Sequence, residues 1–283
     1  MSSASSLPYL HALGAIALWA LLATLGVALS DVPPFLLTGV ALLIGSVPSW
    51  PFVLREPRLW RVPAGTLLLG VYGLFGFHFL LFIALRHAPA VEANLVNYLW
   101  PLLIVVLAPL LLRGVRLRWQ HVAAALAGFA GAALAIAGGR ELQGGLAWGY
   151  LPALGSAFIW ASYSLLTKRV ERFPTAAIGL FGLVSGVLSL LCHALLEPPA
   201  VLGTRDWLLL ALMGLGPLGG AFFLWDRALK EGDPRRIGIL SYLTPLASTV
   251  LLVLASGRAL TPWIAASAAL IVGAAVVGMR ARG

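Results

Sequence analysis

The sequence predicts an all-α integral membrane protein with ten transmembrane helices. Of its 283 residues, 60% are hydrophobic and only 10% are charged, whereas a soluble domain is nearer half apolar and a quarter charged. Apolar runs long enough for a helical span, which needs about 20 residues, recur along the whole chain. The short connections between these runs carry almost all the charged residues. This composition excludes soluble enzymes and nucleic-acid-binding domains.

The ten apolar runs divide into two sets of five. Strands of a membrane β-barrel would be about ten residues long with alternating polarity, so the longer continuous runs predict helices. The first set comprises Tyr9–Ser30, Pro34–Leu54, Val62–Leu85, Val91–Leu112 and Trp119–Ala137. The second set comprises Ala147–Thr167, Pro174–Leu196, Trp207–Trp225, Ile237–Ala255 and Leu260–Met279.

The basic residues predict the orientation of the chain. Ten spans place both termini on one side, and cytoplasmic connections are enriched in Lys and Arg. On the side of the termini lie Arg55, Arg58, Arg61, Arg113, Arg116, Arg118, Lys168, Arg169, Arg172, Arg227, Lys230, Arg235, Arg236, Arg280 and Arg282. The other side carries Arg86, Arg140, Arg205 and Arg258. Both termini are therefore predicted in the cytoplasm, and the net charge of +9 requires no nucleic-acid partner.

An internal repeat relates the two sets of spans. ALRHAPAVEANLVNYLWP (Ala84–Pro101) and ALKEGDPRRIGILSYLTP (Ala228–Pro245) align without a gap at an offset of 144 residues. We therefore predict two repeats, residues 1–140 and 141–283, with five spans each. An odd number of spans inverts the second repeat relative to the first. Inverted repeats are typical of alternating-access transporters, in which the substrate site lies near the membrane midplane.

The fourth span is the most polar. Asn94, Asn97, Tyr98 and Pro101 share one helix face, and Trp100 lies about a quarter turn from it. Polar side chains are costly against lipid, so this face is expected to line a cavity. For Asn94, hydrogen bonding between helices is an equally good interpretation.

The ninth span repeats this pattern. Gly238, Ser241, Tyr242 and Pro245 share a face by the same spacing. Because proline removes a backbone hydrogen bond and kinks a helix, the pair Pro101 and Pro245 predicts a hinge or a central cavity. A packing kink tolerated by the membrane is the alternative.

Aromatic and hydroxyl side chains also form stripes in the third and sixth spans. Trp160 lies too near the middle of its span to be an interfacial anchor, and Trp19 aligns with it in the repeat. The stripe of the sixth span is Ser156, Trp160, Tyr163, Ser164 and Thr167. In the third span, Tyr72, Phe75 and Phe79 share a face with His78 beside it. For His78, a cavity position and a structural role remain equally open.

Glu92 is the only acidic residue that we place inside a span. It lies in the first turn of the fourth span, where the helix N-terminus favours a carboxylate. The functional alternative is a proton site or a site for a substrate ammonium. No catalytic residue, metal site or cofactor motif is predicted.

The candidate lining suits a neutral or zwitterionic, partly apolar solute, because aromatic rings supply stacking and cation–π contacts. Small residues recur at intervals of four in the fifth span (Ala124, Gly128, Ala132) and in the tenth (Ala265, Ala269, Gly273). Such spacing permits close helix packing. It predicts a scaffold between the repeats or a dimer face, and hence a monomer or a weak homodimer in the lipid bilayer.

Two segments resemble the EamA family of the drug/metabolite transporter superfamily. They are ALRHAPAVEANLVNYLWP and GSAFIWASYSLLTKR (Gly155–Arg169). The chain departs from the family pattern where Ala20 and Ala161 follow the paired tryptophans in place of glycine. VNYLWP, AFIWASY and SYLTP are similar to family members that export aromatic amino acids.

The resemblance implies a basket-shaped ten-helix fold in the bacterial inner membrane and export of aromatic amino acids and related hydrophobic metabolites. It implies substrate contacts at Asn97, Tyr98, Trp100, Trp160, Tyr163, Ser241 and Tyr242, and more weakly at His78. Two alternatives remain: an exporter of quaternary ammonium drugs or other small metabolites, and a lipid-modifying membrane enzyme.

Overall fold

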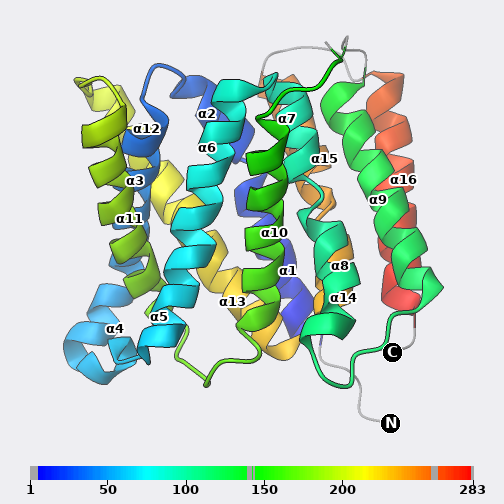
Figure 1. The fold of residues 1–283 in the computed structure, drawn as a ribbon, viewed down its shortest axis with the longest axis horizontal. Coiled ribbons are helices and arrows are strands. Elements are labelled where there is room, and N and C mark those ends of the chain that lie inside the picture. Colours follow the sequence, from blue (N-terminus) through cyan, green and yellow to red (C-terminus); the bar gives the residue numbers. More distant parts are fainter. Residues whose placement is uncertain (1–5, 139–141, 143, 256–260, 282–283) are drawn as a thin grey trace.

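The computed structural model describes residues 6–138, 142, 144–255 and 261–281. Within these residues every regular element is a helix, and the helices stand side by side across one bundle (Figure 1). Arg140, Arg258 and Arg282, which entered the charge comparison, lie outside the described residues. The described part of the chain is therefore all-helical, as predicted.

Among the described residues, the first half of the chain contains nine α-helices, several of which continue one another. Short 3₁₀ turns at Val47–Ser49 and Pro57–Trp60 and a π-helical turn at Tyr72–Gly76 interrupt them. The α-helices are α1 (Leu7–Trp19), α2 (Leu22–Ala28), α3 (Pro34–Ser46), α4 (Trp50–Arg55), α5 (Ala64–Val71), α6 (Phe77–His87), α7 (Ala90–Asn97), α8 (Trp100–Leu111) and α9 (Trp119–Ala137).

The second half has the same character. A second π-helical turn, Gly216–Gly220, joins α12 to α13. The helices are α10 (Tyr150–Leu166), α11 (Ala177–Leu196), α12 (Thr204–Leu215), α13 (Ala221–Glu231), α14 (Pro234–Leu240), α15 (Leu243–Ala255) and α16 (Pro262–Arg280).

Eight helical stretches in the described part are long and apolar enough to cross a membrane. They are Leu7–Ala28, Pro34–Arg55, Ala64–His87, Ala90–Leu111, Trp119–Ala137, Ala177–Leu196, Thr204–Glu231 and Pro262–Arg280. The other two expected spans correspond to α10, which has 17 residues, and to α14 with α15, which are separate helices. Both run through the bundle beside the longer helices (Figure 1).

Helix interruptions occur at corresponding places in the two halves. The two π-helical turns begin 144 residues apart, at Tyr72 and Gly216. The fourth span breaks between α7 and α8, before Pro101, and the ninth breaks between α14 and α15, before Pro245. Proline cannot donate to the carbonyl four residues earlier and its ring clashes with it, which explains a break at this position in each helix.

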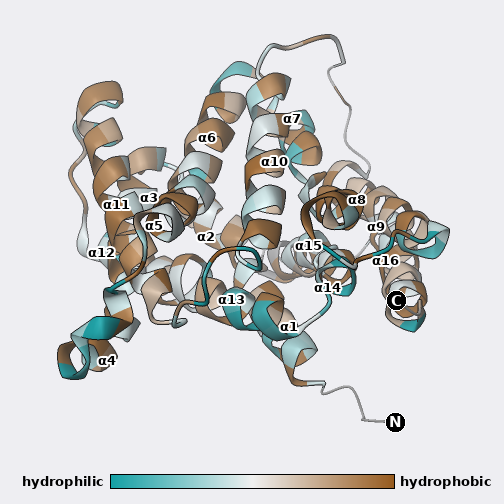
Figure 2. Cartoon of the chain, turned by 60° about the horizontal axis from the view of Figure 1, so that its bottom comes forward, coloured by the Kyte–Doolittle hydropathy of each residue, from teal (hydrophilic) through white to brown (hydrophobic). Residues whose placement is uncertain are grey.

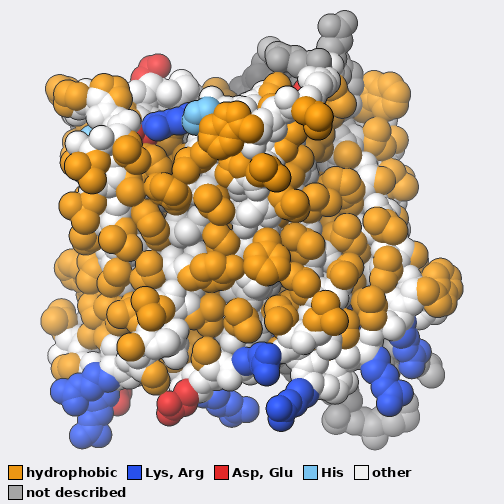
Figure 3. Space-filling model, in the orientation of Figure 1, with side chains coloured by type: hydrophobic (Ala, Val, Ile, Leu, Met, Phe, Trp, Pro, Cys, Tyr) orange, Lys and Arg blue, Asp and Glu red, His pale blue; other side chains and the backbone are white. Residues whose placement is uncertain are grey.

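The outer surface and the two edges of the bundle differ in polarity. Apolar side chains cover the visible face, and Lys and Arg gather along the edge where α1 begins and α16 ends (Figures 1 and 3). We call this the basic edge. Figure 2 shows the same division by hydropathy: the helices are mainly hydrophobic (brown), and hydrophilic residues (teal) lie mostly at the helix ends and in the connections. Inside, α3 packs on α11, α9 on α16 and α1 on α13, so elements from the two halves interleave.

Candidate substrate pocket

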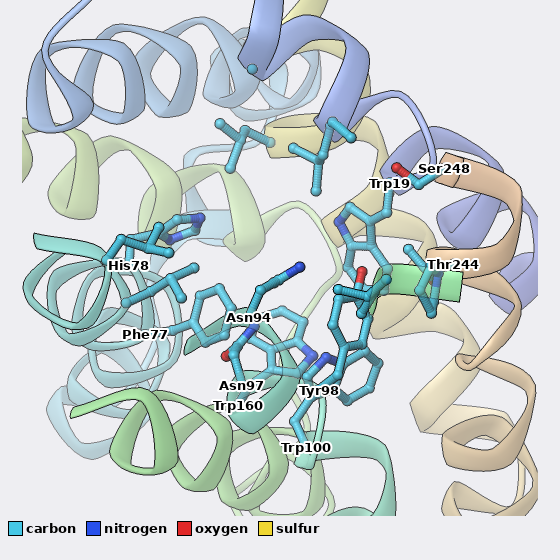
Figure 4. Close-up of a pocket in the computed structure, with 18 of the residues that line it drawn as sticks. Trp19, Phe77, His78, Asn94, Asn97, Tyr98, Trp100, Trp160, Thr244 and Ser248 are labelled. Atoms are coloured by element: carbon cyan, nitrogen blue, oxygen red, sulfur yellow. The ribbon is translucent and has the colours of Figure 1, made fainter. Parts of the chain in front are cut away.

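A pocket of about 560 Å³ lies between helices from both halves of the chain (Figure 4). Helices α1, α2, α3, α6, α7, α8, α9, α10, α12, α13 and α15 all contribute side chains to it. Of the residues predicted to bind substrate or to act as hinges, the structure brings eight to its wall: Trp19, His78, Asn94, Asn97, Tyr98, Trp100, Trp160 and Pro245.

Aromatic side chains form the floor of the pocket. The Trp19 ring centroid lies 5.8 Å from that of Trp160 and 6.3 Å from that of Trp100, both in edge-to-face contact. Phe222 packs against Trp160 at 5.5 Å, and Trp225 lies beneath, 5.2 Å from Trp19. Edge-to-face arrangements are the favoured geometry for such rings. The floor therefore presents fixed aromatic faces to a ligand.

Hydrogen bonds hold two of the four indoles of the floor. Trp19 Nε1 donates to the carbonyl of Pro217 (3.1 Å), in the π-helical turn Gly216–Gly220. Trp225 Nε1 donates to Ser164 Oγ (3.1 Å). The indole N–H groups of Trp100 and Trp160 have no such partner among the described residues. These two donors are available to a ligand.

The polar wall is oriented by neighbouring groups. Ser156 Oγ donates to Asn97 Oδ1 (2.8 Å), which turns the amide N–H groups of Asn97 to other partners. His78 Nδ1 lies 2.6 Å from the carbonyl of Leu74. When Nδ1 carries the proton of that hydrogen bond, Nε2 is left as an acceptor. The wall thus offers both donors and acceptors.

The pocket is uncharged. Among the described residues that line it, none is Asp, Glu, Lys or Arg. An isolated charge is costly to bury without a partner, so a ligand with a net charge gains little here. Aromatic faces together with amide, hydroxyl and imidazole groups suit a neutral or zwitterionic molecule that carries an apolar ring.

The expected stripe of the third span does not line the pocket. The π-helical turn at Tyr72–Gly76 shifts the phase of the helix, because it inserts an extra residue into a turn. Phe75 and Phe79 are thereby moved out of phase with Tyr72 and pack on each other at 5.6 Å, while Tyr72 Oη lies 2.8 Å from Ser162 Oγ. Phe77, which the sequence pattern missed, lines the pocket beside His78.

Four other predicted residues lie behind the wall. Tyr163 packs behind Trp160 at 5.4 Å, and Ser164 accepts the hydrogen bond from Trp225. Ser241 Oγ donates to its own helix, at Ile237. Tyr242 is fully buried and its ring abuts Gly128. These residues support the lining residues and do not themselves face the pocket.

Trp100 lies in the pocket wall, contrary to the helical spacing, which placed it a quarter turn away. The reason is the interruption between α7 and α8: the phase of Asn94 and Asn97 does not continue past Tyr98. Pro101 and Glu92 are not among the lining residues. Pro101 is buried within α8, and Glu92 lies in the first turn of α7.

Two carboxylates are buried where the sequence pattern did not indicate any. Asp226, in α13, is 4% exposed, so the expectation that Glu92 is the only acid within a span was wrong. The side chain of Glu197 has no exposed surface and accepts hydrogen bonds from Arg86 (2.7 Å) and from the backbone of Phe35 (3.0 Å). Asp226 follows directly after the expected end of its span, and Glu197 after the end of α11. Because both residues lie at span ends, the sequence pattern assigned them to the connections.

The repeat offset would have identified one missed floor residue. Phe222 lies 144 residues after His78, and both line the pocket. Phe222 is thus the counterpart of His78 in the repeat, although the two residues differ in type.

Comparison with known proteins decides the family. Residues 6–137 and residues 147–279 each match the model of the EamA-like transporter family. The chain belongs to this family. The two matched segments agree in extent with the two sets of spans, and the family resemblance inferred from the sequence motifs is confirmed.

Relatives within the EamA-like family extend the comparison. An aromatic amino acid exporter YddG of Ancylobacter novellus is 43% identical over 269 residues, which cover 93% of each protein. The protein of the same name in Escherichia coli is 26% identical over 212 residues, 71% of this chain and 72% of that protein. A solved crystal structure with 43% identity superposes with a TM-score of 0.90 and covers 95% of each chain.

Proposed function

We propose that this EamA-like protein exports aromatic amino acids and related hydrophobic metabolites across the bacterial inner membrane. The observation that carries the proposal is the uncharged pocket with its floor of tryptophans. A zwitterionic amino acid has no net charge to bury, and its ring can stack on Trp19, Trp100 or Trp160 while its polar end reaches Asn97 or His78. The names of the relatives from A. novellus and E. coli support the same substrate class.

Transport by alternating access between two inverted repeats, residues 1–140 and 141–283, is the second part of the proposal. Three observations support it: the family model matches twice, the π-helical turns are spaced by 144 residues, and the helix breaks precede Pro101 and Pro245. Bending at those breaks would let α7–α8 and α14–α15 move as hinged spans. Ten membrane-crossing segments are required for this arrangement.

The orientation follows from the basic edge. Cytoplasmic connections carry the excess of Lys and Arg, so the basic edge and both termini face the cytoplasm. The pocket reaches Gly26, Leu85 and Ile136, which lie near the ends of α2, α6 and α9 away from the basic edge. The aromatic floor closes it on the cytoplasmic side. We infer an outward-facing state, with the substrate site open to the cell exterior.

Flux in proteoliposomes tests this function. Vesicles that contain the purified protein are loaded with unlabelled phenylalanine, and uptake of labelled phenylalanine, tryptophan, lysine and glutamate is compared. We expect exchange of the aromatic amino acids only, with or without a pH gradient, and loss of most of it in Trp160→Ala. Exchange indistinguishable from empty vesicles would contradict the exporter assignment. Exchange only under a pH gradient would contradict uncoupled transport.

A quaternary ammonium compound is the second candidate substrate, since aromatic faces attract cations. Competition by an aromatic quaternary ammonium in the same flux assay distinguishes the two classes. A lipid-modifying enzyme is not favoured, because the family of the chain is one of transporters.

A further inference from the structure

A second hollow, of about 690 Å³, lies at the basic edge, away from the substrate pocket. It is bounded by the end of α8, the end of α10 and the start of α14. Its lining comprises Leu112, Arg113, Val115, Lys168, Arg169, Asp233, Pro234 and Arg235. Four of these eight residues are cationic and one is acidic, so the hollow carries an excess of positive charge.

The single acid is already paired within the hollow. Asp233 accepts hydrogen bonds from Arg235 at Nη2 (2.7 Å), at Nε (3.1 Å) and at the backbone N–H (2.9 Å). Burial acts to raise the pKa of Asp233, but the hydrogen bonds and charge of Arg235 hold that pKa below its ordinary value. Asp233 is therefore ionised at neutral pH, and its direct ion pair is with Arg235.

Three cations remain without a carboxylate partner among the described residues: Arg113, Lys168 and Arg169. Lys168 Nζ donates to the carbonyl of Gly232 (3.0 Å), which is a neutral acceptor. Burial is the main cause that lowers the pKa of Lys168, against the opposing effect of Asp233. A bound anion would offset this cost. Because these cations surround one hollow, they form an anion site and not only a basic outer surface.

Apolar surface adjoins the hollow on the side of the membrane. Leu112 and Val115 line the hollow from the side of the hydrophobic core, whereas Leu110 and Leu117, close to them in the sequence, are 74% and 40% exposed. Trp119 is 76% exposed at the start of α9, as is usual for an aromatic anchor at the membrane interface. Figure 3 shows basic side chains immediately below the apolar face. The hollow thus lies at the level of lipid headgroups.

We propose that this hollow binds the phosphodiester headgroup of an anionic phospholipid from the leaflet at the basic edge. The guanidinium groups of Arg113 and Arg169 suit bidentate contacts with phosphate oxygens, and Lys168 adds a third charge. Basic pockets between transmembrane helices bind anionic headgroups by this chemistry. The apolar rim favours a lipid, whose acyl chains would cover it, over free phosphate.

Binding of this lipid would tie three segments together. Arg113 follows α8, Arg169 follows α10, and the Asp233–Arg235 pair begins α14. A ligand that binds only the folded protein stabilises it by an amount that grows with the logarithm of the ligand concentration relative to its Kd. An anionic lipid is therefore expected to raise the thermal stability of the protein.

The test compares charge-matched variants of the full chain in nanodiscs. One nanodisc contains phosphatidylcholine alone, and the other contains phosphatidylcholine with phosphatidylglycerol. The variant R113Q/R169Q removes two exposed cations from the hollow. The control R58Q/R61Q removes two from the same edge, between α4 and α5, and so from outside the hollow. The readouts are the melting temperature and, by native mass spectrometry, the phosphatidylglycerol retained after delipidation.

We expect phosphatidylglycerol to raise the melting temperature of the wild type and of R58Q/R61Q equally, and R113Q/R169Q to lose most of this shift and of the retained lipid. Equal shifts in all three proteins would overturn the proposal, because general attraction to the basic edge would explain them. Inorganic phosphate that reproduces the shift in phosphatidylcholine nanodiscs would overturn the lipid assignment. Lys168→Gln, assayed in the same way, should likewise reduce the melting-temperature shift caused by phosphatidylglycerol.

Discussion

Lys230 Nζ lies 2.6 Å from Asp226 Oδ2, one helical turn away in α13. The same ammonium donates to the carbonyl of Phe173 (2.8 Å) and lies 4.1 Å from the centre of its ring. Thr175 Oγ1 donates to the same carboxylate (2.7 Å). The pair therefore ties α13 to the segment before α11, on the basic-edge side of Trp225 and the pocket floor.

A counterpart exists at the opposite edge. Arg86 aligns with Lys230 in the repeat, pairs with Glu197 at 2.7 Å and lies 5.6 Å from the ring centre of Phe35. Each cation thus lies near the end of a span, over a phenylalanine in or just before the first turn of another span, and pairs with a buried carboxylate. An ion pair combined with a cation–π contact therefore stabilises both edges of the molecule.

Removal of Lys230 alone should destabilise the protein strongly. Lys230→Met leaves the carboxylate of Asp226 buried without its cation, which typically costs about 3–5 kcal/mol. The double variant D226N/K230M should recover much of that loss, because no uncompensated charge remains. Unfolding in mixed micelles measures both, with the exposed Arg227→Met as the control. Additive effects of the two substitutions would show that the pair is not coupled.

Ser156 should affect ligand binding through Asn97. Ser156→Ala removes the hydrogen bond that orients the amide, and a net hydrogen bond contributes about 0.5–1.5 kcal/mol. Since about 1.4 kcal/mol is tenfold in affinity, we expect roughly 2- to 10-fold weaker binding of phenylalanine. Equilibrium binding measures this change. In Ser162→Ala, whose hydroxyl contacts Tyr72 and the backbone, affinity should stay near the wild-type value, and an equal loss in both would contradict the role of Ser156.

Gly70 should not tolerate a methyl group, whereas Gly65 in the same helix should. A Cβ at Gly70 would lie 2.2 Å from the ring of Phe181, while one at Gly65 would meet nothing within 4 Å. Overpacking costs about 1–3 kcal/mol, and Ala in place of Gly on an open helix face gains about 0.5–1 kcal/mol. Melting temperatures should therefore move in opposite directions for Gly70→Ala and Gly65→Ala. A neutral Gly70→Ala would show that α5 and α11 can separate freely.

The Asp233–Arg235 pair should make stability depend on pH at the acidic end. The pKa of Asp233 is lower in the folded protein than its value of about 3.9 in an unfolded chain. Its contribution is present above the unfolded pKa and is lost as pH falls through the folded one. Asp233→Asn keeps an acceptor for the helix N-cap but removes the charge. The stability difference from the wild type should be constant from about pH 5 to 8 and shrink below pH 4; a constant difference throughout would contradict the ion pair.

Helical spacing predicted part of the pocket lining, and helix interruptions account for some of the residues that it misplaced. Trp19, Asn97 and Trp160 reach the pocket as their spacing indicates. Tyr72, Phe75 and Phe79 do not; the π-helical turn that begins at Tyr72 takes Phe75 and Phe79 out of the helical phase of Tyr72. Tyr163 and Ser164, in the unbroken helix α10, also lie behind the wall. Tyr242 matches Tyr98 in the repeat, yet Tyr98 lines the pocket while Tyr242 packs on Gly128. A repeat fixes the register of two residues but not the neighbours that each one meets.

The sequence by itself determined that the protein is helical and membrane-embedded, where its apolar runs lie, and to which family it belongs. Those properties follow from composition, periodicity and local motifs, which act over a few turns of helix. Only the tertiary structure decided which side chains share the pocket, because residues such as Trp19 and Pro217 meet across 198 positions of sequence. It likewise decided that Asp226 and Glu197 are buried. Asp226 is paired with Lys230 of its own helix and with Thr175 before α11, and Glu197 with Arg86 and the backbone of Phe35; these partners compensate the cost of removing a carboxylate from water.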